Sequence, residues 1–319
     1  MRDTVLFGDC RDTLKTLHAQ ITTGIAERPQ MCVTSPPYYG LRDYGGKEQQ
    51  IGMEQSPEEY IAEMVKVFSS VRDVLAEDGT LWVNIGDTYY NYRSDGNYPK
   101  QTVAKTRQDL PTSTPVRGNK LEGYKSKDLI GIPWMLAFAL RADGWWLRQD
   151  IIWHKPNPMP ESVRDRCTKS HEYIFLLSKS KNYYYDNEAI KEPVKQDWGT
   201  RNRDNGKYHN EGTGLQPHSG LTKSYDKKNK RSVWSVTNKP YKGAHFAVFP
   251  PDLIEPCILA GSNEGDVILD PFMGSGTTAM VAKKHNRHYI GCELNRDYAT
   301  LQTDRIDSIP TKLPDILWK

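Results

Sequence analysis

The sequence of 319 residues predicts an α/β fold. Short apolar runs alternate with longer segments of helical spacing, which is the pattern of a sheet covered by helices. A glycine-rich turn, residues 270–278, directly follows one of these runs and leads into a helix, and an acid, Glu293, stands just after the next run. A chain of this length can bury a full core, either as one large domain or as a domain with a lobe.

The amino-terminal part alternates strand and helix. Thr4–Gly8 is predicted as a strand, a helix starts over Arg11–His18, and Gln30–Val33 is a buried strand that leads directly into two prolines. Ser56 is a suitable N-cap, because a proline follows it and a glutamate stands three residues later, so a long helix begins there. Its apolar residues recur at helical spacing: Tyr60, Ile61, Met64, Val65, Phe68, Val71, Val74 and Leu75.

Beyond Gly79 the alternation continues. Thr80–Ile85 is an apolar run and is predicted as a strand, and Ile130–Arg141 is predicted as a helix because its proline suits the first turn. The remaining elements follow the same reasoning: strands over Trp146–Trp153, Tyr173–Leu177, Val267–Leu269 and His288–Cys292, and helices over Pro250–Ala260 and Thr277–Lys284.

Basic residues are concentrated in two stretches, although the net charge of the chain is only +3. Residues 91–127 hold eight basic and three acidic residues, and residues 188–235 hold ten and six. A solvated loop explains either stretch alone, whereas two such insertions in a near-neutral chain favour a polyanionic partner.

Composition argues against a membrane protein and against a metal site. No signal peptide is visible, and no apolar run approaches the roughly 20 residues that span a bilayer, so we expect a cytoplasmic protein. The five cysteines are scattered without a C-x-x-C pair, which argues against a disulfide framework and a zinc site. We expect them to be small core residues: Cys10, Cys32, Cys167, Cys257 and Cys292.

The glycine-rich turn predicts a nucleoside-binding site. Its glycines let the backbone approach a ligand, and the helix that follows offers free N–H donors. Glu293, at the end of the next strand, is placed to accept both hydroxyls of a ribose. A phosphate-binding loop would need Gly-Lys-Ser/Thr and a nicotinamide fold a third glycine, and neither is present. The turn reads Asp270-Pro271-Phe272-Met273-Gly274-Ser275-Gly276-Thr277-Thr278.

A second motif follows the strand Gln30–Val33 and reads Thr34-Ser35-Pro36-Pro37-Tyr38-Tyr39-Gly40-Leu41-Arg42-Asp43-Tyr44. Two prolines stiffen this turn and remove two N–H donors, so its carbonyls are free to accept hydrogen bonds. A polar side chain, a fixed carbonyl and an aromatic ring in succession suit a flipped base. Taken alone, the motif fits a structural Pro-Pro turn with packed tyrosines equally well.

Together the two motifs closely resemble the beta group of DNA amino-methyltransferases, which modify N4 of cytosine or N6 of adenine. The resemblance implies a Rossmann-like, S-adenosylmethionine-dependent methyltransferase fold in permuted motif order, with an inserted DNA-recognition region. It also covers Gly8-Asp9-Cys10, and further matching stretches lie at 79–87, 153–160, 171–174 and 245–250. Only the two basic stretches fall outside it.

The resemblance implies a role for each motif. Ser35 and the Pro36 carbonyl would accept the two N–H groups of the target amine, and Tyr38 would stack on the base, with Pro37 completing the catalytic motif. Glu293 would bind the ribose of S-adenosylmethionine, Gly274–Thr278 would surround its methionine part, and Asp9 would meet its adenine. Phe272 would lean on the cofactor or simply pack. The cofactor-binding set is Asp9, Asp270, Pro271, Phe272, Gly274, Ser275, Gly276, Thr277, Thr278 and Glu293.

Serine at position 35 resembles the cytosine-N4 members, so we predict cytosine N4, with adenine N6 as the alternative. A non-catalytic nucleic-acid-binding protein of this fold would be expected to lose one of the two motifs, and RNA is a weaker alternative substrate. We predict a catalytic domain over 1–187 and 236–319, carrying the basic loop 91–127, and a target-recognition insertion over 188–235. The predicted DNA contacts are Arg201, Arg203, Lys207, Lys228 and Arg231.

The expected partner is double-stranded DNA. A cognate restriction endonuclease acting on the same site is a further possible partner, and the chain is expected to be a monomer or a homodimer.

Overall fold

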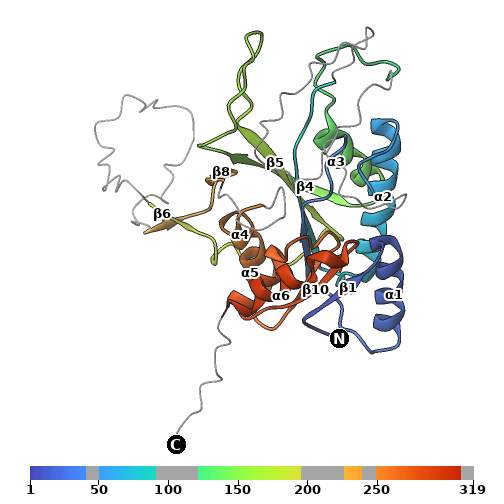
Figure 1. Ribbon diagram of the computed structural model, residues 1–319. Helices are drawn as coiled ribbons and strands as arrows, with labels where there is room; N and C mark the ends of the chain where they lie inside the picture. Colours follow the sequence, from blue (N-terminus) through green and yellow to red (C-terminus); the bar gives the residue numbers. More distant parts are fainter. Residues whose placement is uncertain (41–49, 91–120, 195–225, 239–248, 310–319) are drawn as a thin grey trace, which may run out of the picture.

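The computed structural model describes residues 1–40, 50–90, 121–194, 226–238 and 249–309. Within them a central sheet lies between two layers of helices (Figure 1). Its strands are β1 (Thr4–Phe7), β2 (Met31–Thr34), β3 (Thr80–Ile85), β4 (Trp146–His154), β5 (His171–Ser178), β8 (Val233–Ser235), β9 (Val267–Asp270) and β10 (His288–Glu293). The helices are α1 (Cys10–Thr22), α2 (Pro57–Val74), α3 (Ile132–Ala142), α4 (Pro251–Gly261), α5 (Thr277–Lys284) and α6 (Ala299–Asp307), the last preceded by the 3₁₀ helix η3 (Arg296–Tyr298).

The sheet is parallel apart from one strand. Its order is β1-β10-β9-β2-β3-β5-β4-β8, and β5 pairs antiparallel with both β3 and β4. The predicted α/β class is therefore confirmed. Strands β9 and β2 are parallel neighbours although they lie far apart in the sequence, so the permuted order of the two motifs still brings their strands together.

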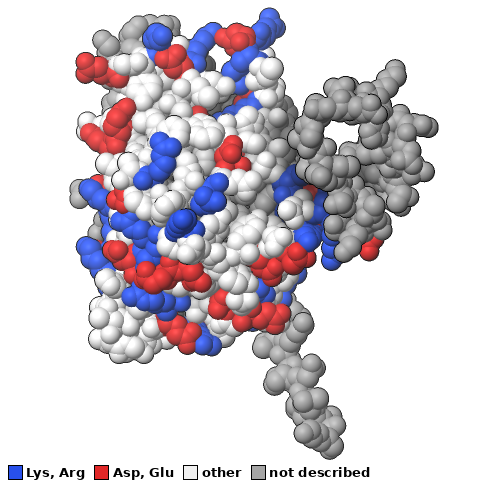
Figure 2. Space-filling view, turned by 180° about the vertical axis from the view of Figure 1, so that it is seen from behind, with Lys and Arg blue, Asp and Glu red and all other residues white. Residues whose placement is uncertain are grey.

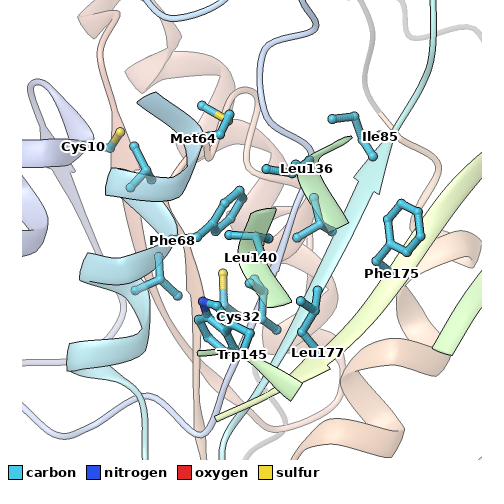
Figure 3. Packing of buried hydrophobic residues seen from close by; sticks show 14 of the residues in the cluster. Cys10, Cys32, Met64, Phe68, Ile85, Leu136, Leu140, Trp145, Phe175 and Leu177 are labelled. Carbon is cyan, nitrogen blue, oxygen red and sulfur yellow. The ribbon is translucent and has the colours of Figure 1, made fainter. Parts of the chain in front are cut away.

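Alternate residues of the strands face two different cores, as expected for a sheet covered on both sides. On β2, Cys32 belongs to the core beneath α1, α2 and α3, whereas Met31 and Val33 belong to the core beneath α4, α5 and α6. Figure 3 shows part of the first core, where Phe68 of α2 and Leu140 of α3 pack close to Cys32.

The helices that follow β2 and β9 consequently cover opposite faces of the sheet: α2 packs in the first core and α5 in the second. In open α/β sheets, ligands bind at such a reversal, in the crevice beyond the carboxyl ends of the two strands.

The predicted elements are confirmed, with bounds that differ by a few residues at most ends; the largest extension is α1, which continues to Thr22. Ser56 caps α2, since its hydroxyl accepts a hydrogen bond from the Glu59 N–H at 3.2 Å. The sequence did not predict the short antiparallel pair β6 (Glu192–Pro193) and β7 (Lys227–Lys228), nor the edge strand β8. Strand β8 belongs to the main sheet, although it lies at the end of the range assigned to the insertion.

The surface carries both signs of charge. On the face shown in Figure 2, basic and acidic side chains are interspersed and form no large patch of one sign. No helix in the described part of the chain is both long and apolar enough to cross a membrane. Four of the cysteines are buried as predicted, but Cys167 is exposed, because it lies in the connection between β4 and β5 rather than in a core.

Candidate active site

The two predicted motifs lie side by side at the carboxyl ends of β2 and β9. Cys32 pairs with Leu269 across these strands, so the residues that follow each strand lead into neighbouring turns. The Thr34 hydroxyl donates to Asp270 Oδ1 at 2.6 Å and links the two motifs directly. The structure thus brings together Ser35-Pro36-Pro37-Tyr38 and the glycine-rich turn, as the resemblance implies.

Asp270 supports the glycine-rich turn from behind. Its two oxygens accept hydrogen bonds from the hydroxyls of Thr34 and Thr278, each at 2.6 Å, and from the Phe272 N–H at 3.0 Å. Burial raises the pKa of this carboxyl to about 6, although the two hydroxyls and the N–H group oppose the shift. Because these groups occupy the carboxylate, we interpret Asp270 as the residue that shapes the turn rather than as a direct ligand contact.

The turn itself presents backbone donors and one unused hydroxyl. Gly274 and Gly276 have φ of +52° and +81°, a region that favours glycine. Gly276 caps α5, so the first N–H groups of this helix point out of its end. The Thr277 hydroxyl is buried and has no hydrogen-bond partner among the described residues. Such an atom is unusual in a folded protein, and this one lies in the first turn of α5, next to the N–H groups at the helix end.

The remaining residues of the turn are buried or half-buried. Pro271 and Ser275 are buried, and Phe272 is half-buried and packs against the first core. The Ser275 hydroxyl accepts from Arg305 at 2.7 Å, and the Gly274 carbonyl accepts from Gln302 at 2.7 Å. Both donors belong to α6, which the sequence reasoning did not connect with this site.

Glu293 ends β10, the neighbour of β9, and faces the turn. One of its carboxylate oxygens accepts from the Gly274 N–H and the other from the Asn295 N–H, each at 2.8 Å. Burial raises the pKa of Glu293 to about 7, although these N–H donors oppose the shift. Each carboxylate oxygen has a further lone pair, so Glu293 can accept hydroxyl donors as well.

Asp9 is held differently. It caps α1 through the Arg11 N–H, and the Arg11 guanidinium bonds both carboxylate oxygens and reaches Glu63 as well. Burial opposes ionisation of Asp9, but the hydrogen bonds from Arg11 outweigh it, so its pKa lies below the ordinary value. In this structure the Asp9 carboxylate is engaged with Arg11, and its contact with the adenine stays a prediction.

The proline-rich turn is anchored on both sides. The Tyr60 hydroxyl of α2 donates to the Pro37 carbonyl at 2.8 Å, Pro36 is buried, and Ser35 is half-buried. The Tyr38 hydroxyl donates to Glu172 Oε2 at 2.7 Å.

Sequence reasoning noted the stretches that contain Asn84, Lys155 and Glu172 but gave these residues no role. Their position next to Tyr38 depends on the register of β3, β4 and β5, which is not visible in a sequence motif.

Of the predicted DNA contacts, Arg201, Arg203 and Lys207 lie outside the described residues, as does the stretch 245–248. Lys228 lies on β7, and the exposed Arg231 forms an ion pair with Glu192 of β6. Among the residues that the structure describes, no group of three or more His, Cys, Asp or Glu side chains is arranged to hold a metal ion.

Comparison with known proteins gives a consistent result. A family model for N6/N4 methyltransferases, described as a DNA methylase, matches residues 30–304. The Type II methyltransferase M.SmaI of Serratia marcescens is 45% identical over 306 residues, which cover 95% of this chain and 90% of the relative. M.Cfr9I of Citrobacter freundii, also a Type II methyltransferase, is 47% identical over 281 residues, covering 88% and 82%.

Solved structures share the fold. The cytosine-N4-specific PvuII DNA methyltransferase superposes with a TM-score of 0.61 at 17% identity, covering 98% of this chain and 89% of its own. A putative DNA modification methylase from Thermus thermophilus, solved with S-adenosylmethionine, gives a TM-score of 0.56 at 22% identity, covering 96% and 94%.

Proposed function

Because this chain belongs to the N6/N4 family of DNA methylases, we propose that it transfers a methyl group to the exocyclic N4 of cytosine in double-stranded DNA. Methylation of DNA, with S-adenosylmethionine as the donor, is the activity of the family. The choice of N4 is supported by Ser35, since serine at the first position of the motif resembles the cytosine-N4 members. PvuII methyltransferase, which shares the fold, is described as cytosine-N4-specific.

The residues around the glycine-rich turn fit the donor. A nucleoside with an amino-acid tail requires acceptors for ribose hydroxyls and donors for a carboxylate. Glu293 supplies the acceptors, and the first turn of α5 supplies N–H donors beside the unpartnered Thr277 hydroxyl. When bound, S-adenosylmethionine supplies a methyl group activated by its sulfonium. We propose that Gly274–Thr278 and Glu293 hold it.

The proline-rich turn would prepare the base. An exocyclic amino nitrogen is a weak nucleophile because its lone pair is delocalised into the ring. Ser35 Oγ and the Pro36 carbonyl each accept one N–H of this amine, which draws the nitrogen toward tetrahedral geometry and frees its lone pair. Tyr38 stacks on the base and fixes its plane. Positioning and electrostatics, rather than a covalent enzyme intermediate, then supply the acceleration.

The observation that carries this proposal is the hydrogen bond from Thr34 to Asp270, which fixes the two motifs at adjacent strand ends. Methylation of a panel of defined duplexes, followed by mass analysis of the nucleosides, tests it. We expect N4-methylcytosine. N6-methyladenine from the wild type would refute Ser35 as a cytosine marker while leaving the methyltransferase activity in place, and no product from any duplex would contradict the activity itself.

Variants at Ser35 sharpen the test. Ser35→Ala removes one acceptor, and loss of one preorganised group typically lowers the rate by about 10²–10³-fold. We expect this loss in single-turnover methylation at saturating DNA, with unchanged binding of S-adenosylhomocysteine, the demethylated donor. Ser35→Asp gives the motif the form common in adenine-N6 members. If other parts of the pocket choose the base, this variant still yields only N4-methylcytosine, at a reduced rate.

A further inference from the structure

An ion pair lies directly behind Tyr38, and no step above uses it. Lys155 Nζ donates to Glu172 Oε1, while Glu172 Oε2 accepts from the Tyr38 hydroxyl at 2.7 Å. Both charged side chains are largely buried, with 17% and 15% of their surfaces exposed. The phenol, the carboxylate and the ammonium therefore form one continuous chain of hydrogen bonds.

Strand direction places this pair at the site. Because β5 runs antiparallel to β3, it begins where β3 ends, and Tyr173 pairs with Ile85. Strand β4 ends at the same edge, where His154 pairs with His171. Lys155 and Glu172 are the neighbours of these paired residues, at the edge of the sheet that carries the proline-rich turn.

The Tyr38 ring has little freedom at this place. A Cβ at Gly86 would come within 2.8 Å of Tyr38 Cε2 and 3.3 Å of the Glu172 carboxyl carbon, so only glycine leaves room for the ring. Asn84 Nδ2 donates to Glu172 Oε2 at 3.4 Å and to the Tyr173 carbonyl at 3.1 Å, so it holds the same carboxylate oxygen that accepts from Tyr38. Lys155 lies over the Trp153 ring, 4.2 Å from its centroid.

The chemistry of the pair favours a role other than stability. Burial raises the pKa of Tyr38 well above its ordinary value and the Glu172 charge raises it further, so the phenol stays protonated and donates. Hydrogen bonds to a charged acceptor are about twice as strong as neutral ones. Burying two charges, by contrast, gives little net stability compared with apolar packing. This arrangement suits a role in orienting the Tyr38 side chain.

We propose that the Lys155–Glu172 pair positions the target base, by fixing through the Tyr38 hydroxyl the place of the ring on which the base stacks, while the close approach of Gly86 limits rotation of that ring. This inference rests on the proposed function. Glu172 and Lys155 are positioning residues: they act through Tyr38 and contact neither the base nor the donor.

A double-mutant cycle tests the proposal. Tyr38→Phe keeps the stacking ring and removes only the hydroxyl, and Glu172→Gln keeps the shape and removes the charge. In single-turnover methylation at saturating DNA and S-adenosylmethionine, we expect each variant to lose about tenfold in rate. Residues that act through one bond are not additive, so the double variant should also lose about tenfold rather than about a hundredfold.

Two controls separate positioning from folding. Glu161 lies in the same β4–β5 connection and pairs with Arg166 away from Tyr38, so Glu161→Gln should keep the wild-type rate. Thermal unfolding of all variants reports stability. A merely structural Glu172 would lower the rate equally with and without the Tyr38 hydroxyl.

The outcomes are distinct. Losses that multiply in the double variant would overturn the inference. So would a wild-type rate for Tyr38→Phe, even where Glu172→Gln fails to fold. A wild type that methylates no duplex would refute the proposed function and this inference with it, whereas an active wild type with multiplying losses refutes the inference alone.

Discussion

Two carboxyl groups of the candidate site have raised pKa values because they are buried at the ends of strands. Glu293 and Asp270 lie at the ends of neighbouring strands, and burial raises the pKa of both, to about 7 and about 6. Their partners differ: Asp270 accepts from two side-chain hydroxyls and one backbone N–H, whereas Glu293 accepts from backbone N–H groups alone among the contacts found in the described residues. The two residues therefore lead to different predictions, one for ligand binding and one for stability.

Glu293 should make donor binding dependent on pH. Ribose hydroxyls donate to the ionised carboxylate, so binding favours the deprotonated form and weakens as the pH falls below about 7. Calorimetric titration with S-adenosylhomocysteine from pH 5.5 to 8.5 measures this. Glu293→Ala should weaken binding by one to two orders of magnitude, since bonds to a charged group contribute roughly 1.5–3 kcal/mol.

Glu293→Gln separates this carboxyl from groups of the ligand that titrate in the same range. The variant should lose the part of the pH dependence that Glu293 causes, while Glu77→Gln, which alters an exposed carboxylate paired with Lys179, should keep it. Identical pH profiles for the wild type and Glu293→Gln in a folded protein would remove Glu293 from the site.

Asp270 should lower stability as the pH rises. Its folded pKa of about 6 exceeds the ordinary value of 3.8, so between these values the folded state keeps a proton that the unfolded state has released. Stability from this group is therefore greatest at low pH and decreases as the pH rises through 6, by on the order of 3 kcal/mol at 1.36 kcal/mol per pKa unit.

Asp270→Asn mimics the protonated form and tests that sign. The free energy of unfolding in urea, measured at pH 4, 5, 6 and 7, should change in favour of the variant, relative to the wild type, as the pH rises. A constant difference across this range would contradict the assignment.

At the residue scale, the sequence was sufficient to predict which turns lie together. Ser35 and Gly274 stand in two contiguous motifs, and Glu293 ends the strand that follows the glycine-rich turn. Their roles in binding and catalysis stay predictions. Glu172 could not be found in this way, because its approach to Tyr38 requires β5 to run antiparallel to β3. Residues paired by long-range register carry no local signal.

Whole elements show the same division. Helix α2 was predictable because its N-cap and its apolar spacing both lie within one short stretch of sequence. Strands β6, β7 and β8, by contrast, contain only two or three residues and form by pairing with strands far away in the sequence. Helix α6 was not predicted, and neither was its contact with the glycine-rich turn. That contact arises because the chain turns back after β10 and packs α6 against α5.

We expect helix α6 to strengthen binding of the donor indirectly, by supporting the glycine-rich turn. Gln302 Nε2 donates to the Gly274 carbonyl at 2.7 Å, which holds the turn in its left-handed conformation. Removing a hydrogen bond of this kind costs about 1 kcal/mol, so Gln302→Ala should weaken binding of S-adenosylhomocysteine about fivefold in calorimetric titration.

Thr303 offers a matched control on the same helix. It is exposed, and its hydroxyl bonds only the Ala299 carbonyl in the turn before it among the bonds recorded in the described chain. Thr303→Ala should leave the affinity unchanged. Equal affinity of Gln302→Ala and the wild type would show that the turn keeps its shape without α6.

At the scale of the whole molecule, we propose that chemistry and recognition lie in separate parts of the chain. Both motifs lie at strand ends of one sheet, at the kind of reversal where ligands bind in open α/β sheets, and this layout follows from the order of strands and helices. The basic stretches lie outside the pattern that predicts the sheet. We propose that residues 188–235 read the DNA sequence, and the structure defines where such an insertion leaves the sheet.

The two segments that flank residues 195–225 are paired with each other. Strands β6 and β7 pair Glu192 with Lys228, the Val194 N–H donates to the Asp226 carbonyl at 3.0 Å, and Arg231 pairs with Glu192. Val194 and Asp226, which flank residues 195–225, are therefore adjacent, so a short Gly-Ser linker can replace the segment without moving either flanking residue. Strand β8, which follows β7 in the sequence, belongs to the main sheet.

Replacing residues 195–225 by such a linker should preserve the fold and donor binding but abolish sequence preference on DNA. Thermal unfolding and titration with S-adenosylhomocysteine measure the first two properties, and methylation of competing duplexes measures the third.

Phosphate contacts by basic residues make DNA affinity fall as the salt concentration rises, with a slope that scales with their number, so the linker variant should have a shallower slope. In the full chain, replacing Arg201, Arg203 and Lys207 together by glutamine should lower the slope in the same direction. Retained sequence preference in the linker variant would place base reading elsewhere, with 91–127 as the next candidate, and loss of donor binding would show that the segment supports the catalytic domain instead.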